Sequence, residues 1–523
     1  MQADSQSLPI MSALEHYFRH NAELITRGIE KEGLRATPLS EISQTDHPCS
    51  LGHPLTHSRI TTDYSEALLE LITPVSNSRE ALLNNLHNTH RFVLDNIGEE
   101  LMWAGSMPCR INGNESIRIA EYGDSNIGIL KHVYRRGLDV RYGRIMQSIA
   151  GLHYNFSLDD KFWTLLHERS ESALNLKDFK SDRYFALTRN FRRYSWLLMY
   201  LFGASPALDE SFLDGAKHAL DSFDDKGTLY KKYATSLRMG DLGYHNNAQA
   251  SLAICFNTLD NFNDTLGDAI ETPYPAYEKI GLKKGHEFIQ LNTNILQIEN
   301  EYYSSIRPKR SAHSGEKPTQ ALRKRGVEYV EIRCVDLNPF EPLGISHAQC
   351  SFLDVFLLLC LHDDSPFLDD QTCKTLEENF SLVVNEGRRP NLMLKSNGEN
   401  LALTDWATKL LDAMQPFAEL LDAQQSDDSY QTALAAQRLT IDDVSLTPSA
   451  QVLNNMKAQN RSWLELGNQL STAHKQTLLS SKTNMEALAD LKKEQKNSLR
   501  QELKIKQQDT MDFSDFLAAY QAS

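Results

Sequence analysis

The chain has 523 residues; 41% of them are apolar and 24% charged, and 25 glycines and 17 prolines are spread along its length. This composition excludes collagen-like, disordered and low-complexity proteins, and the length excludes a small disulfide-stapled module. The 54 basic and 69 acidic residues give a formal net charge of −15, which repels nucleic-acid phosphates and anionic membrane surfaces. We therefore expect no nucleic acid and no membrane among its partners.

Cysteine usage and the N-terminus favour a cytoplasmic protein. The seven cysteines are odd in number and include no C-x-x-C pair, so reduced thiols are expected. The N-terminal MQADSQSLPIMS has neither a basic start nor an apolar stretch, which predicts no signal peptide. No apolar run approaches the roughly 20 residues of a membrane span.

The first half of the chain predicts helices alternating with strands. Apolar residues at helical spacing predict a helix over 9–27, and a strand candidate over 28–35 follows it. After a loop rich in Pro, Ser, His and Thr, β-branched and aliphatic residues predict a second strand, and a long alternating stretch predicts a third. The remaining expectations here are strands over 60–74 and 145–158 and helices over 78–102, 129–142 and 182–202.

The second half predicts two more strands and then helices. The strand candidates span 288–300 and 326–338, and a basic loop joins them. From about residue 347 the pattern is almost entirely helical. No repeat, long heptad array or linker marks a boundary, so we expect an α+β fold with a sheet of at least five strands: a catalytic body over 1–345 and a mainly helical part over 346–523 packed on it.

Carboxylates recur on one face of the predicted strands. Alternate side chains of a strand share a face, so Glu30 and Glu32 point the same way, about 7 Å apart. A lone pair of this kind is more often a solvent-facing edge. Glu70 is more informative because it lies among apolar neighbours, where an unpaired carboxylate is costly unless a cation neutralises it.

Two further strands repeat the pattern. His153 and Asn155 share a face with Gln147, and Glu331 shares a face with Arg333. A single histidine on a strand is commonly only hydrogen-bonded, but recurrence across four strands favours a functional face. Oxygen ligands with one histidine suit Mg²⁺ or Mn²⁺, and a guanidinium beside a carboxylate suits a phosphoryl group. This layout is typical of ATP-dependent phosphoryl transfer without a P-loop or a dinucleotide-binding glycine motif, neither of which occurs.

Several segments resemble the glutamate–cysteine ligase of γ-proteobacteria. The resemblance implies a glutamine-synthetase-like, largely antiparallel sheet of about six strands that forms the active-site face. It also implies ATP-dependent joining of the γ-carboxyl of L-glutamate to the amine of L-cysteine through a γ-glutamyl phosphate, and a monomer. The segments are GIEKEGLR (28–35), ITTDYSEALLELITPV (60–75), MQSIAGLHYNFSL (146–158), YLFGASPAL (200–208), YATSLRMGDLGY (233–244), LQIENEYYSSIRPKR (296–310) and EYVEIRCVDLNPF (328–340).

The same resemblance implies roles for individual residues. Those that match the family's Mg²⁺-binding set are Glu30, Glu32, Glu70, His153 and Glu331. Arg333 matches the arginine that meets the transferred phosphoryl group, and Asp63 an acidic residue near metal and amine. The glutamate site is expected to involve Arg238, Gln147, Ile149 and Asn155. The cysteine pocket is expected to involve Tyr64, Tyr134, Arg135, Leu138, Tyr244 and Tyr303.

Alternatives remain open at this point. Pocket chemistry selects the acceptor, so a glutamate ligase that uses another amine is one alternative. A non-catalytic binding protein with this fold and a two-metal hydrolase using the same carboxylates are others. The basic run Arg307–Arg310 is interpreted either as a loop near the ATP phosphates or as a solvated loop.

Overall fold

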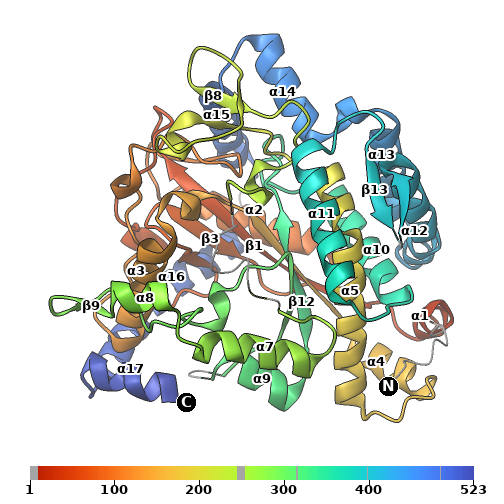
Figure 1. Cartoon of the computed structure of the whole chain (residues 1–523), viewed down its shortest axis with the longest axis horizontal. Helices are drawn as coiled ribbons and strands as arrows, with labels where there is room; N and C mark the ends of the chain where they lie inside the picture. Colours follow the sequence, from red (N-terminus) through yellow and green to blue (C-terminus); the bar gives the residue numbers. More distant parts are fainter. Residues whose placement is uncertain are drawn as a thin grey trace.

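The computed structural model describes residues 10–243, 252, 254–313, 316–396, 398–482 and 484–522. A seven-stranded sheet runs through the middle of the molecule in the order β11-β12-β5-β1-β3-β2, with β4 paired to β1 (Figure 1). Every pairing in it is antiparallel, which confirms the predicted α+β class and sheet. Its strands are β1 (Ile25–Ala36), β2 (Ile60–Thr62), β3 (Leu68–Ile72), β4 (Leu101–Met102), β5 (Leu152–Leu158), β11 (Ile306–Lys309) and β12 (Tyr329–Val335).

Helices surround the sheet and make up most of the chain after residue 346, as predicted. The helices before that point are α1 (Ile10–Phe18), α2 (Arg79–Leu94), α3 (Asn126–Tyr142), α4 (Asp160–Glu168), α5 (Leu176–Phe202), α7 (Leu259–Glu271), α8 (Pro275–Ile280) and α9 (Pro318–Arg325). Those after it are α10 (His347–His362), α11 (Asp370–Glu386), α12 (Leu403–Gln425), α13 (Ser429–Asp442), α14 (Pro448–Gln459), α15 (Trp463–Ser480), α16 (Met485–Gln508) and α17 (Phe513–Ala522).

Smaller sheets lie outside the central one. Strands β6 (Ala207–Asp209), β7 (Asp221–Ser222) and β8 (Thr228–Tyr230) form a three-stranded sheet. Two hairpins are made by β9 (Lys283–Lys284) with β10 (Glu287–Phe288) and by β13 (Met393–Ser396) with β14 (Glu399–Ala402). None of the described helices is both long and apolar enough to cross a bilayer.

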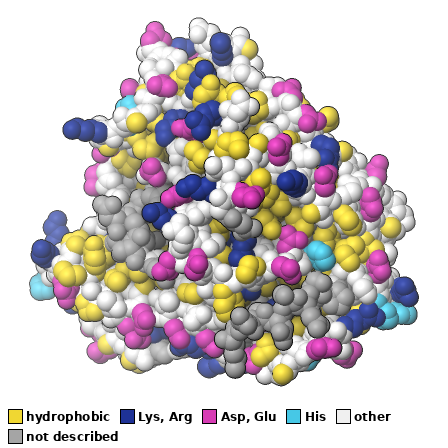
Figure 2. All heavy atoms as spheres, turned by 45° about the vertical axis from the view of Figure 1, so that its right-hand side comes forward, with side chains coloured by type: hydrophobic (Ala, Val, Ile, Leu, Met, Phe, Trp, Pro, Cys, Tyr) yellow, Lys and Arg dark blue, Asp and Glu magenta, His cyan; other side chains and the backbone are white. Residues whose placement is uncertain are grey.

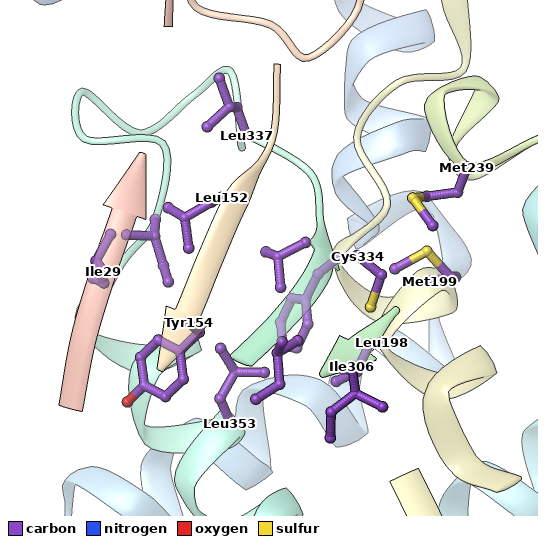
Figure 3. Close-up of a cluster of buried hydrophobic side chains, with 14 of the residues drawn as sticks. Ile29, Leu152, Tyr154, Leu198, Met199, Met239, Ile306, Cys334, Leu337 and Leu353 are labelled. Carbon is purple, nitrogen blue, oxygen red and sulfur yellow. The ribbon is translucent and has the colours of Figure 1, made fainter. Parts of the chain in front are cut away.

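One face of the central sheet is apolar and packs against helices. Helix α5 contacts β11 and β12, α2 contacts β1 and β3, and α10 packs against both helices. Figure 3 shows Ile29 and Tyr154 from neighbouring strands beside Leu353 of α10, with Leu198 and Met199 of α5 farther along the sheet. Each such buried side chain contributes about 1.5–3 kcal/mol to the stability of the fold. Burial of this face therefore holds the sheet against its helices and leaves the other face to polar residues.

Several element boundaries differ from the sequence expectations. Helix α1 ends at Phe18, and β1 already begins at Ile25. The predicted strand over 60–74 is a hairpin of β2 and β3, because the backbone turns at Ser65, whose carbonyl accepts from Leu68 N at 3.0 Å. The predicted strand over 145–158 is a 3-10 turn, η3 (Ile145–Ser148), followed by β5. Gln147 therefore does not share a strand face with His153, and that expectation was wrong.

The chain around the predicted strand over 288–300 is mostly irregular. Beyond β10, side-chain amides bind the backbone there: Leu291 N donates to Gln297 Oε1 and Asn294 N to Asn292 Oδ1, each at 3.0 Å. Such local bonds compete with a strand ladder. The expected basic loop instead contains a strand and a helix, β11 and α9. The edge strand β11 thus comes from residues expected to be a loop.

Candidate active site

The strand register brings the predicted carboxylates and the histidine onto one face of the sheet. Glu30 of β1 lies opposite His153 of β5, and Glu32 lies opposite Glu70 of β3. On the other side of β5, Glu331 of β12 lies opposite Asn155. Directly paired residues of antiparallel strands share a face, so four strands contribute to one polar surface opposite the apolar one.

His153 lies among three carboxylates. Its Nδ1 is 3.3 Å from Glu30 Oε2 and 3.8 Å from Glu331 Oε1, and its Nε2 is 3.5 Å from Glu32 Oε1. Glu30, His153 and Glu331 each offer one ligand atom, and these atoms lie within 4.8 Å of one another. Carboxylate oxygens with one imidazole nitrogen at this spacing fit a divalent cation.

Glu70 adds a further carboxylate with no cationic partner within 4.0 Å among the described residues. Burial, and then the negative charges of Glu30 and Asp63, raise the pKa of Glu70 well above its usual range. Like charges gathered in a poorly solvated place are unfavourable unless a cation or protons neutralise them. The carboxylate cluster therefore favours the binding of a cation.

The opposite end of the cluster is basic. Glu331 is buried, but its Oε2 accepts from Arg333 Nη1 at 2.8 Å, and Lys309 Nζ lies 3.2 Å from its Oε1. Burial raises the pKa of Glu331, yet the charges of Lys309 and Arg333 outweigh it and hold that pKa well below the usual range. Arg307 lies opposite Glu331 on β11, and burial lowers the pKa of its guanidinium to about 10.

A cavity of about 110 Å³ adjoins this surface. Strand β1, the β2–β3 turn, α3, η3, β12 and the irregular segment after residue 288 all contribute to its walls. The predicted site residues that line it are Glu32, Asp63, Tyr64, Tyr134, Arg135, Leu138, Gln147, Tyr303 and Arg333. The lining residues that the sequence did not single out are Tyr142, Met146, Asn300 and Glu301.

Helix α3 is fixed to the turn that carries Asp63. The Nε of Arg135 donates to the backbone oxygen of Asp63, and its guanidinium lies 4.6 Å from the ring centroid of Tyr122. On the same helix, Tyr134 precedes Arg135 and Leu138 follows it, and both line the cavity. This helix therefore positions one wall of the cavity relative to the carboxylates.

Glu301 is the principal residue that sequence reasoning missed. Its Oε1 accepts from Tyr142 Oη at 2.5 Å and from Arg141 Nη1 at 3.0 Å, and its Oε2 accepts from Gln297 N at 2.6 Å. These bonds tie α3 to the irregular segment, so that both reach the cavity. No local pattern could have indicated this, because Arg141 and Tyr142 lie about 160 positions earlier in the chain.

Arg238, Asn155 and Ile149, the other predicted substrate-site residues that the structure describes, do not line the cavity. Arg238, in the 3-10 turn η5 (Leu237–Met239), is buried and donates from Nε to Asp336 at 2.8 Å. A side chain at Gly151 would come within 2.8 Å of Arg238 Nη1, so this glycine leaves room for the guanidinium. Asn155 donates to Glu30 Oε1 at 2.9 Å. Ile149 is buried at the end of η3, and Tyr244 lies outside the described residues.

Comparisons with known proteins agree on one family. The family model described as glutamate-cysteine ligase matches residues 12–383. The glutamate–cysteine ligase of Pseudomonas putida strain W619 is 52% identical, covering 95% of this chain and 94% of its own, and that of Hahella chejuensis is 51% identical with 95% coverage of both. A crystal structure of glutamate–cysteine ligase from Francisella tularensis in complex with AMP aligns with a TM-score of 0.89 at 36% identity, covering 96% of this chain and 98% of that one.

Proposed function

The chain belongs to the glutamate–cysteine ligase family, and from this premise we propose that the polar face of its sheet joins the γ-carboxyl of L-glutamate to the amine of L-cysteine with ATP. Formation of γ-glutamylcysteine in this way is the first step of glutathione biosynthesis. The observation that carries the proposal is the position of Glu331, which lies between His153 on one side and the cations Lys309 and Arg333 on the other.

We propose that Glu30, Glu32, Glu70, His153 and Glu331 hold Mg²⁺, for which Mn²⁺ would substitute. The grouped ligand atoms of Glu30, His153 and Glu331, and the unneutralised carboxylate of Glu70, fit such ions. Bound there, the ions would offset the negative charge of the ATP phosphates during transfer. The acidic protein thereby becomes able to bind an anionic nucleotide.

The reaction would proceed in two displacements. An oxygen of the glutamate γ-carboxylate first bonds to the γ-phosphorus of ATP while the bond from that phosphorus to ADP breaks. The amine of cysteine then bonds to the activated carbonyl carbon, the carbon–oxygen bond to phosphate breaks, and the nitrogen loses a proton. Activation is needed because an amine does not displace oxide from a free carboxylate at a useful rate.

Individual side chains would position and neutralise the reacting groups. Arg333 meets the transferred phosphoryl group, because its guanidinium lies beside Glu331 and lines the cavity. Arg238 would bind a substrate carboxylate next to Glu32, with Gln147, Ile149 and Asn155 completing the glutamate site. Asp63 would accept a hydrogen bond from the substrate amine at the cavity wall.

The cavity would hold the side chain of cysteine. Its volume of about 110 Å³ suits a small side chain, and its walls combine the aromatic rings of Tyr64, Tyr134 and Tyr303 with Leu138. Within the described residues the buried hydroxyl of Tyr64 has no hydrogen-bond partner, so it offers one polar contact to the acceptor. We propose that Arg135 and Tyr244 complete this pocket.

Phosphate release from ATP tests the acceptor. The full chain is assayed with Mg²⁺, ATP and L-glutamate plus one amine at a time, with L-cysteine and L-alanine as the critical pair. Cysteine is expected to give the higher kcat/KM, since the pocket rather than the sheet selects the amine. Equal rates with the two amines would contradict the cysteine assignment. Hydrolysis of γ-glutamylcysteine with Mg²⁺ and without ATP would instead favour a two-metal hydrolase.

We also propose that the chain acts as a monomer in the cytoplasm. The monomer is what the family resemblance implies, and the seven free thiols suit a reducing compartment. A molar mass near 59.4 kDa by light scattering is the expected result.

A further inference from the structure

A second cavity lies on the helix-covered side of the sheet, away from the carboxylates. Its volume is about 340 Å³, and it is bounded by the start of β1, the first turn of α2, the end of α12 and the start of α13. Its buried lining includes Leu24, Ile25, Arg27, Arg79 and Tyr430. Cavities of this size hold small organic molecules.

Arg79 gives this cavity a buried positive charge. The residue is only 4% exposed, and its guanidinium carbon lies 3.8 Å from the ring centroid of Tyr430. Its Nη2 donates to Gln425 Oε1 and Ser429 Oγ, both at 2.7 Å. In the part of the chain that the structure describes, its buried Nη1 has no hydrogen-bond partner, and no carboxylate lies within 4.0 Å of it.

The neighbouring arginine, Arg27, has a carboxylate partner. Arg27 lines the same cavity, but its guanidinium pairs with the fully buried carboxylate of Asp354 at 2.7 Å. A buried guanidinium without a carboxylate keeps an unmet demand for an anion. Among the described residues, Arg79 therefore lacks the directly paired carboxylate that Arg27 has, and the charge of Asp427 acts on it only from a longer distance.

The exposed rim of the cavity has the opposite charge. Glu23, Glu80 and Asp427 lie there, and the carboxylate of Asp427 accepts from the backbone and hydroxyl of Ser429 rather than from Arg79. Between floor and rim the lining mixes apolar side chains, among them Phe18, Leu24 and Leu421, with the polar side chains of Asn77, His347 and Gln424. A ligand that matches these surfaces has a carboxylate, an apolar side chain and an ammonium group.

We propose that this cavity binds a free amino acid with an apolar side chain, its carboxylate against Arg79 and its ammonium group at the acidic rim. The site is separate from the active site, because Arg27 projects from β1 to the helix-covered side, where it meets Asp354 of α10. Asp354 also accepts from Tyr154, the neighbour of His153 on β5. The ligand would thus bind behind the catalytic strands without competing for the substrates.

Isothermal titration of the full chain with L-leucine tests the proposal. L-Leucinamide, which lacks the carboxylate, and 4-methylpentanoate, which lacks the ammonium group, are the comparison probes. Leucine is expected to bind and the amide to bind about tenfold more weakly or worse, because only the acid can pair with Arg79. Saturating L-glutamate with L-cysteine should leave the leucine affinity unchanged. No heat of binding with leucine, or displacement by the substrates, would overturn the proposal.

Variants locate the binding site. Arg79→Gln is expected to lower leucine affinity about tenfold or more, whereas Arg135→Gln, in the other cavity, should not change it. Equal affinity in wild type and Arg79→Gln would refute the assignment. If circular dichroism shows that Arg79→Gln does not fold, the variant Glu80→Lys on the exposed rim replaces it as the test. Glu80→Lys should lower the affinity for leucine more than the affinity for 4-methylpentanoate. Equal losses of affinity for both probes would refute the proposed orientation.

Discussion

Glu331 illustrates how a single buried carboxylate can stay charged. It is 1% exposed, and an unpaired carboxylate there would take up a proton, but Lys309 and Arg333 lie within 3.2 Å and 2.8 Å of its oxygens. The pKa of Glu331 consequently stays well below its usual range. A residue that remains anionic beside two cations can bind a metal ion on one side and orient a guanidinium on the other.

Neutralising Glu331 or removing Arg333 should abolish most turnover. We expect Glu331→Gln and Arg333→Ala each to lower kcat by about 100-fold or more, since each removes charge that acts on the moving phosphoryl group. Steady-state phosphate release measures the effect, and circular dichroism verifies the fold. Glu328→Gln, at a partly exposed carboxylate just before the same strand, is the matched control. Turnover near that of the control in either variant would contradict the assigned roles.

His57 makes stability depend on pH. Its Nδ1 accepts hydrogen bonds from the backbone N–H groups of Arg59 and Ile60, both at 3.0 Å, which requires an unprotonated nitrogen. Burial lowers the pKa of His57 from 6.5 to about 4. Between these two values the unfolded chain binds more protons than the folded one, so the free energy of unfolding falls as the pH falls from about 6.5 toward 4.

Replacing His57 by asparagine should weaken that dependence. The amide oxygen can accept the same backbone bonds but does not titrate. From pH 8 to pH 5 the wild type is expected to lose about 2 kcal/mol more free energy of unfolding than His57→Asn. Urea unfolding at the two pH values measures the difference. Parallel losses in both proteins would show that His57 is not the titrating group.

At the scale of elements, helix α17 supports the candidate active-site cavity from outside. Leu517 of α17 is buried in a small apolar cluster with Leu130 and Val133 of α3 and Leu291. Tyr134, which packs against this cluster, also lines the active-site cavity. Helix α17 lies beside α3 in Figure 1, so a segment at the end of the chain helps position a wall formed near residue 134.

Weakening this contact should affect the KM for cysteine more than the KM for ATP. Leu517→Ala removes buried apolar volume, and we expect the KM for cysteine to rise roughly threefold or more while the KM for ATP changes less, because α3 loses its support. Leu503→Ala on α16, where the leucine is 56% exposed, is the control. Equal changes in both KM values would indicate a general loss of stability instead.

At the scale of the whole molecule, the charge of −15 is partly concentrated at the site. Figure 2 shows basic and acidic side chains interspersed over one face of the surface. The carboxylates of Glu30, Glu32 and Glu70, in contrast, gather on one sheet face, and Asp63 lies in the adjoining β2–β3 turn. Burial, and then repulsion by the neighbouring carboxylates, raises the pKa of Glu70. The folded chain should therefore gain stability when a divalent cation binds.

Magnesium should raise the unfolding temperature. A ligand that binds only the folded state adds about 2.7 kcal/mol at a hundredfold excess over its Kd. Calorimetry with MgCl₂, against KCl of equal ionic strength, measures the gain. Glu70→Gln should unfold at a higher temperature than wild type without Mg²⁺, because it removes one repelling carboxylate, and should gain less from Mg²⁺. The same Mg²⁺ shift in both proteins would place the ion elsewhere.

We propose that residues 1–345 and 346–523 form one unit rather than two separable domains. Helix α10 packs against α5 and α2, α15 and α16 pack against α2, and α17 packs against α3. The helices after residue 346 thus support both the apolar side of the sheet and the wall of the cavity. Their expected role is to hold the catalytic strands in place.

The sequence by itself determined which strand residues share the polar face of the sheet. Strand side chains alternate with a period of two whatever the tertiary context, so the phase of Glu30 with Glu32 and of Glu331 with Arg333 could be predicted from local pattern alone. Resemblance to a known family then added residues such as Asp63 and Tyr134, which line the cavity. The fold class followed because apolar and polar residues separate cleanly along the strands and helices.

Only the tertiary structure decided where the chain turns and how the pocket closes. The break between β2 and β3, the irregular course after residue 288 and the formation of β11 depend on hydrogen bonds and pairings with partners elsewhere, which no local pattern contains. The place of Glu301 in the cavity depends on Arg141 and Tyr142, and the buried, unpaired state of Arg79 on α12 and α13. Long-range packing fixes such features because their stabilising partners meet only when the chain has folded.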